Sequence, residues 1–142
     1  GKITLFFVAG AIYVGAKLSK ISELNGQGKS MPLIFIAFFI GSLSIIGVPP
    51  MGGSWSKFFL MLGAAESGYF FVIAVFCVST ILNVYYLLEI PARAFFFKKE
   101  KQITPKIPVL ITIPTLMTCF LTILLFFFIE PFQNLASLMV SK

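Results

Sequence analysis

Histidine is absent from this sequence, and cysteine and charged residues are scarce. The 142 residues include two cysteines, and only 11% of the side chains are charged. Cys77 and Cys119 lie in separate apolar segments without CxxC spacing, so the sequence indicates neither a structural metal site nor a redox pair. Because histidine, a nucleophile–base set and a phosphate-cradling glycine loop are all missing, we expect no active site, metal or cofactor in this chain.

Hydrophobic residues take the place of the missing charges. They make up 58% of the chain and include 18 phenylalanines, whereas soluble proteins carry about 25% charged residues. Long apolar runs of this kind are typical of segments embedded in lipid. The net charge of +6 comes from short basic clusters between these runs, which argues against nucleic-acid binding. Gly1 and Lys2 lead directly into the first run without an initiator methionine, so we expect a piece of a longer polytopic membrane protein.

The apolar runs predict an all-α fold with about four membrane crossings in one transmembrane domain, and no separate soluble domain. The expected spans cover residues 3–17, 32–66, 69–97 and 107–130, and residues 49–53 interrupt the second span. After Pro131, apolar residues at helical spacing predict a short amphipathic helix in the membrane interface. Its apolar positions are Phe132, Leu135, Leu138 and Met139.

The second run can cross the membrane once, as a broken helix, or twice. Residues 54–66 would rise only about 20 Å as a helix, against roughly 30 Å of hydrocarbon, so they are short for a separate span. A single crossing also places the two basic loops on the same side. The basic residues are Lys17, Lys20 and Lys29 in one loop, and Arg93, Lys98, Lys99, Lys101 and Lys106 in the other. We therefore predict one broken crossing, with both loops cytoplasmic and the C-terminus outside.

The interruption has the composition of a helix break. Pro49 and Pro50 lack N–H donors, and Gly52 and Gly53 tolerate backbone geometries that other residues avoid, so backbone groups are left unpaired. Such groups are tolerated in a membrane where they are buried in protein or line a hydrated cavity, as in the ion sites of transporters. The alternative is a kink or re-entrant turn that only shapes helix packing.

Lys57 follows the interruption by four residues and is flanked by Trp55, Phe58 and Phe59. A lysine in mid-membrane costs about 2.5 to 3.5 kcal/mol, so it should face protein or water. Since desolvation opposes its charge, a modest change in the local field can switch it between proton-bound and neutral forms. We predict a proton-carrying role for Lys57. The alternative is a lysine that extends to the outer interface.

Polar residues around the interruption and in the third span are candidates for supporting Lys57. They are Ser42, Ser44, Ser54, Ser56, Asn83 and Glu89. The serines can hydrate Lys57, or they can bond their own helix backbone. We expect Asn83 to join helices rather than conduct protons, although in a wet channel it could hold water. Glu89 precedes Arg93 by four residues, which favours an interfacial ion pair over a proton relay.

Several segments together resemble the C-terminal part of the antiporter-like membrane subunits, which respiratory complex I shares with the Mrp-type multisubunit Na+/H+ antiporters. They are GKITLFFVAGAIY, ELNGQGKSMP, GSLSIIGVPPMGGSWSKFF and STILNVYYLLEIPARAFF. The resemblance extends from Lys2 to Phe97. The GGSWSKFF variant, and the end of the chain soon after the fourth span, are more similar to the D-type subunits of Mrp antiporters than to the chain 2, 4 and 5 membrane-arm subunits of complex I.

The resemblance implies a proton-conducting subunit of a cation/proton antiporter in the cell inner membrane, with other membrane subunits, lipid, protons and Na+ as partners. In the family a lysine or glutamate follows a broken helix, and Lys57 matches it. Lys2 matches the lysine of an H-x-x-x-K-x-x-L-F pattern that often opens the preceding helix, of which this sequence contains the K-x-x-L-F part, since the histidine position would lie upstream of Gly1. Two alternatives remain. One is a proton-pumping membrane-arm subunit of an NADH:quinone oxidoreductase, in which case the chain would be a subunit of an enzyme without containing its active site. The other is a structural or assembly membrane subunit.

Overall fold

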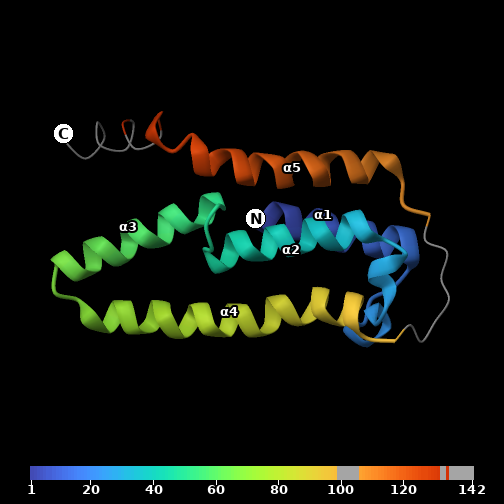
Figure 1. The fold of residues 1–142 in the computed structure, drawn as a ribbon, viewed down its shortest axis with the longest axis horizontal. Coiled ribbons are helices and arrows are strands. Elements are labelled where there is room, and N and C mark those ends of the chain that lie inside the picture. The colour runs from blue at the N-terminus through green and yellow to red at the C-terminus, as the bar shows by residue number, and fades with distance from the viewer. Residues whose placement is uncertain (99–105, 132–133, 135–142) are drawn as a thin grey trace.

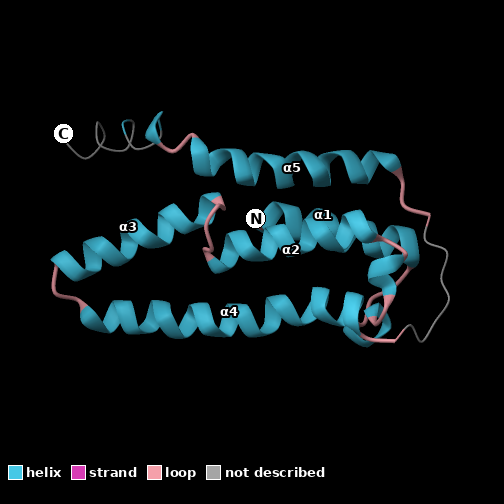
Figure 2. Ribbon diagram, viewed as in Figure 1, coloured by secondary structure: helices cyan, strands magenta, loops and turns pink. Residues whose placement is uncertain are grey.

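The computed structural model describes residues 1–98, 106–131 and 134, and this part of the chain is helical without strands. Its α-helices are α1 Lys2–Ala16, α2 Pro32–Ile46, α3 Gly52–Glu66, α4 Phe70–Phe96 and α5 Val109–Phe127. Two short 3₁₀ helices, η1 Ile21–Leu24 and η2 Gln27–Lys29, connect α1 to α2 (Figure 2). The all-α class predicted from the sequence is therefore confirmed. The predicted amphipathic helix after Pro131, and Lys99 and Lys101 of the second basic loop, lie outside the described residues.

The helices lie roughly side by side along one long axis (Figure 1). Helix α4 runs almost the full length of the bundle, and α2 and α3 follow one another along it. Both α2 and α3 contact α4, and α5 contacts α1, α2 and α3 from the other side. The gap between α2 and α3 therefore lies midway along the bundle, between α4 and α5 (Figure 1).

Two of the described helices are long and apolar enough to cross a membrane. They are α4, with 27 residues, and α5, with 19 residues, while α1 and α2 are apolar but shorter. Most side chains of α4 and α5 point outward, and large apolar residues such as Phe96 (87% exposed) and Leu110 (85% exposed) cover the surface. An exterior of this kind is stable against hydrocarbon but not against water, which agrees with the membrane environment predicted from composition.

The best-packed part of the bundle lies where α1 and α2 meet the second half of α4. Its fully buried side chains include Val8 of α1, Phe35 of α2 and Ala94 of α4. The loop between α1 and α2 also lies against α4, because a Cβ on Gly28 would come within 2.8 Å of the Ala94 carbonyl oxygen. In contrast, α3 has no buried residue. The side chains of α3 are therefore more exposed than those of α1 and α2, and α3 is the helix that contains Lys57.

Candidate functional site

The chain leaves the helical conformation between Ile46 and Gly52. Gly47 ends α2 with a left-handed φ of 88°, and its N–H donates to the Leu43 carbonyl at 2.9 Å. Pro49 and Pro50 follow and offer no N–H to continue the ladder. Gly52 and Gly53, which the sequence placed in the interruption, instead form the first turn of α3. The non-helical residues are thus 47–51, since the αL conformation of Gly47 ends the helix earlier than the prolines would.

Glycine is needed at the start of α3 because this turn lies directly against its neighbours. A Cβ on Gly53 would be 1.9 Å from the Ser44 carbonyl oxygen in the last turn of α2. A Cβ on Gly52 would be 3.1 Å from the Leu125 Cβ of α5. Real Cβ atoms do not approach a backbone oxygen as closely as 1.9 Å, so the interruption is held by a backbone-to-backbone contact that only glycine permits.

Lys57 extends from the second turn of α3 back towards the end of α2. Its Nζ donates to the Ile46 carbonyl oxygen at 2.8 Å and to Thr80 Oγ1 of α4 at 3.1 Å. Its stem passes over Gly47, where an added Cβ would be 2.8 Å from Lys57 Cδ. The carbonyls at a helix C-terminus form the negative end of the helix dipole, so the end of α2 favours the ammonium.

A cavity of about 490 Å³ opens beside Lys57. Residues from α2, α3, α4 and α5 and from the interruption line it, and most are apolar. The polar side chains among them are Ser54, Lys57 and Thr80. A water molecule occupies about 30 Å³ in the liquid, so the cavity can hold several waters next to the ammonium. A lysine beside such waters can exchange a proton with them, which a lysine sealed in hydrocarbon cannot do.

Trp55 and Phe126 line this cavity and belong to an aromatic cluster. Trp55 stacks on Phe59 with ring centroids 5.8 Å apart, and it lies 5.8 Å from the ring of Phe126 on α5. The indole Nε1 also donates to the Phe126 carbonyl oxygen at 3.2 Å. These contacts fix α3 against α5 and so hold the helix that presents Lys57.

Two of the four candidate serines bond their own helix backbone. Ser42 Oγ donates to the Phe38 carbonyl at 2.8 Å, and Ser54 Oγ donates to the Met51 carbonyl at 2.7 Å. Ser44 is buried and Ser56 is exposed. For Ser42 and Ser54 the structure thus shows the backbone-bonding alternative, although Ser54 also lines the cavity beside Lys57.

Lys2 is exposed at the start of α1 and is not joined to Lys57 directly. Among the described residues, no hydrogen bond or ion pair links the two lysines. The start of α1 nevertheless lies near the interruption, because a Cβ on Gly1 would be 3.0 Å from the Ser44 side chain. Ser44 therefore lies between the first residues of α1 and the first turn of α3.

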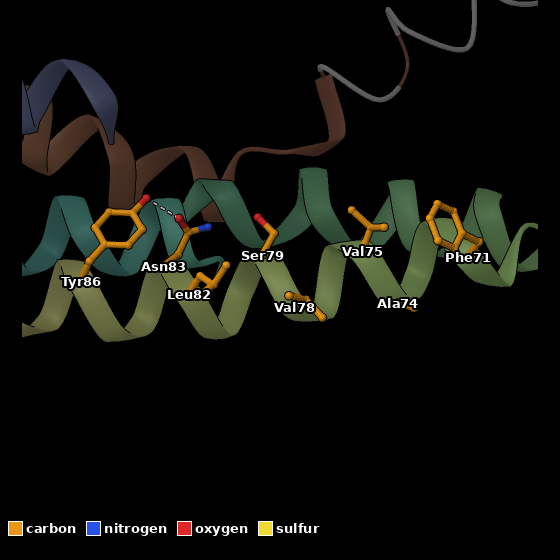
Figure 3. A pocket seen from close by; sticks show the side chains of 8 residues that line it. All are labelled: Phe71, Ala74, Val75, Val78, Ser79, Leu82, Asn83 and Tyr86. Atoms are coloured by element: carbon orange, nitrogen blue, oxygen red, sulfur yellow. Dashed lines mark hydrogen bonds between the residues drawn. The ribbon is translucent and has the colours of Figure 1, made fainter.

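Asn83 and Glu89 lie further along α4 and outside the cavity that contains Lys57. Asn83 lines a separate groove of about 530 Å³ formed by α4 residues, where its Oδ1 accepts a hydrogen bond from the Tyr86 hydroxyl (Figure 3). Glu89 Oε1 accepts from Arg93 Nη2 at 2.7 Å, and the guanidinium also lies 5.3 Å from the centre of the Phe97 ring. The ion pair expected from the spacing of Glu89 and Arg93 is therefore present.

The sequence did not point to Thr80 or to the Ile46 carbonyl, which are the two groups that bond Lys57. A hydroxyl inside an apolar helix was the available signal at Thr80. Whether that hydroxyl can contact Lys57 depends on which face of α4 turns towards α3, and sequence spacing alone does not specify that face.

The family of the chain follows from its similarity to known proteins. Residues 1–83, more than half of the chain, match the family model described as "NADH:quinone oxidoreductase/Mrp antiporter, TM". The N-type subunit of the NADH-quinone oxidoreductase of Desulforudis audaxviator is 37% identical over 64% of this chain and 18% of its own length. The D-type subunit of the Na(+)/H(+) antiporter of Alkalihalophilus pseudofirmus is 31% identical over 92% of this chain and 27% of its own length. The chain thus spans about a fifth to a quarter of the length of these relatives.

A solved structure shares the fold. Respiratory complex I from Thermus thermophilus with bound aureothin contains a chain that matches with a TM-score of 0.72 and 23% identity. The match covers 87% of this chain and 29% of that chain. The resemblance seen in the sequence is confirmed, and the chain belongs to the NADH:quinone oxidoreductase/Mrp antiporter family of transmembrane proteins.

Proposed function

We propose that this chain carries part of a proton translocation path in a proton-conducting membrane subunit of a multisubunit Na+/H+ antiporter. Lys57 is the proton-carrying group. The observation that carries the proposal is the position of its Nζ, which lies 2.8 Å from the Ile46 carbonyl at the interrupted end of α2. In this proposal the chain moves protons and does not transform a substrate.

The surroundings of Lys57 support both of its protonation states. The Ile46 carbonyl and the Thr80 hydroxyl stabilise the ammonium, which would otherwise be costly in a membrane. The adjacent cavity supplies room for the waters that would deliver and remove the proton. Interrupted helices whose free carbonyls face an ion are a recurring feature of transporters.

Lys2 is proposed as the neighbouring proton-carrying group. Its support is the match to the K-x-x-L-F pattern and the contact between the start of α1 and Ser44. Since Ser44 also meets Gly53, the start of α1 and the helix that carries Lys57 share this neighbour. Asn83 and Glu89 are proposed as structural supports of α4, because their partners are Tyr86 and Arg93 rather than Lys57.

We further propose that α2 and α3 cross the membrane once, as one discontinuous helix. Each contains 15 residues, and together they extend along the length of α4, which has 27 residues (Figure 1). A single crossing leaves both basic loops at one end of the bundle. The bias of basic loops towards the cytoplasm then favours a cytoplasmic position for both loops and an outer position for the C-terminus.

The antiporter is favoured over a complex I membrane arm by the extent of similarity. The D-type antiporter relative aligns with 92% of this chain, whereas the N-type oxidoreductase relative aligns with 64%. The antiporter-type protein therefore accounts for more of this sequence.

Ion exchange by everted membrane vesicles tests the proposal. Vesicles that contain the complete protein and its partner subunits are expected to release protons when Na+ is added, and vesicles lacking the protein are not. Proton movement driven only by NADH oxidation would favour the complex I alternative. If neither occurs although the complex assembles normally, the protein is a structural subunit and the proposal is wrong.

A further inference from the structure

Thr80 is the side chain of α4 that reaches Lys57. Its Oγ1 accepts a hydrogen bond from Lys57 Nζ at 3.1 Å and donates one to the Phe76 carbonyl oxygen at 2.8 Å. We infer that Thr80 is a positioning residue for Lys57, whose hydroxyl pairs with both the charged and the neutral form of that side chain. The inference rests on the proton-carrying role proposed for Lys57.

The two partners of Lys57 differ in what they can offer. An ammonium has three protons to donate, and both the Ile46 carbonyl and the Thr80 oxygen can accept one. A neutral amine has a lone pair that needs a donor, and a carbonyl cannot provide one. Of the two groups bonded to Nζ, the Thr80 hydroxyl is the one that carries a proton it can donate.

Rotation of the hydroxyl about one bond, Cβ–Oγ1, allows Thr80 to donate a hydrogen bond to the neutral form of Lys57. When Lys57 gives its proton to cavity water, the Thr80 hydroxyl turns from the Phe76 carbonyl to the Lys57 nitrogen and becomes the donor. Thr80 keeps its own proton throughout, and the transferred proton passes between Lys57 and water. The Phe76 carbonyl retains its backbone partner in α4, so the rotation leaves the helix intact. Lys57 therefore stays in place in both states instead of swinging away after each transfer.

Substitution of Thr80 separates the hydroxyl from the shape of the side chain. Thr80→Val keeps the volume and removes the hydroxyl, and we expect proton flux to fall about tenfold, as for loss of one hydrogen bond to a charged group. Thr80→Ser removes a methyl group but keeps the hydroxyl, and we expect flux within about twofold of the unchanged protein. The control is Thr112→Val, which removes the same type of bond to the carbonyl four residues earlier, on α5.

Proton flux should be measured in vesicles with equal amounts of the complete protein, alongside Lys57→Ala. Loss of flux in Thr80→Val with recovery in Thr80→Ser supports the inference, because a packing role would be damaged more by serine than by valine. Full flux in Thr80→Val, or equal losses in both Thr80 variants, overturns it. If Lys57→Ala loses flux while Thr80→Val keeps it, the inference fails and the proposed function stands. Full flux in Lys57→Ala overturns both.

Discussion

Replacement of Lys57 by alanine is expected to lower proton flux through the complete protein by about 100-fold or more, the effect typical of removing a positioned proton-transfer group. The alanine methyl group cannot carry a proton. Protons would therefore have to pass between waters in the cavity without the ammonium as an intermediate carrier. The cavity beside the site has a volume of about 490 Å³, so water can replace the lost hydrogen bond to Ile46. We therefore expect normal amounts of assembled protein.

Lys57→Arg should lose flux as well, because the guanidinium stays protonated at every physiological pH. The matched control is Lys29→Ala, which removes an exposed lysine in the loop between α1 and α2. Proton flux per assembled complex is measured in vesicles for Lys57→Ala, Lys57→Arg and Lys29→Ala. Flux in Lys57→Ala close to that of Lys29→Ala would refute the role given to Lys57.

Gly53→Ala, in the first turn of α3, is expected to be the most damaging small substitution next to the interruption. The added Cβ would be 1.9 Å from the Ser44 carbonyl oxygen, and neither atom belongs to a flexible side chain that can move away. The first turn of α3 must then shift relative to α2, at a cost of about 1 to 3 kcal/mol or more. The shift would also carry Lys57 away from the Ile46 carbonyl, so we expect less assembled protein and lower flux through what remains.

Gly63→Ala provides the matched control, because Gly63 lies on the same helix and an added Cβ there meets nothing within 4 Å. Alanine favours an exposed helix over glycine by about 0.5 to 1 kcal/mol, so this variant should be as stable as the unchanged protein or slightly more stable. Thermal denaturation of the purified complex and its yield from membranes measure both variants. Equal stability of Gly53→Ala and Gly63→Ala would show that the contact with Ser44 is not tight.

Local chemistry predicted several features of the site. Two prolines remove consecutive N–H donors whatever the tertiary fold, so an interruption near Pro49 and Pro50 follows from their covalent structure. Residues four apart meet on any helix, which is why the pair of Glu89 and Arg93 was predictable from spacing. The apolar neighbours of Lys57 in the sequence predicted an unusual environment for a charged side chain.

Features that depend on how helices face one another were not predictable. Thr80 bonds Lys57 because α4 presents that face to α3, and one sequence does not specify the rotation of a helix in a bundle that is apolar on all sides. The reason for Gly53 is a contact with Ser44, nine residues earlier, that arises from the angle between α2 and α3. The position of Lys2 relative to Lys57 likewise depends on how α1 packs against α2, which sequence spacing does not specify.

The central claim is that position 57 carries a proton, and the comparison of Lys57→Glu with Lys57→Gln tests it most directly. The two side chains have nearly the same size and shape, but only glutamate can bind and release a proton. A protonated carboxyl can donate to a carbonyl oxygen and accept from a hydroxyl, and these are the two kinds of group that bond Lys57. In vesicles with equal amounts of protein, we expect proton flux through the glutamate variant to exceed that through the glutamine variant by about tenfold. A glutamine variant that conducts protons as fast as the unchanged protein would contradict the account.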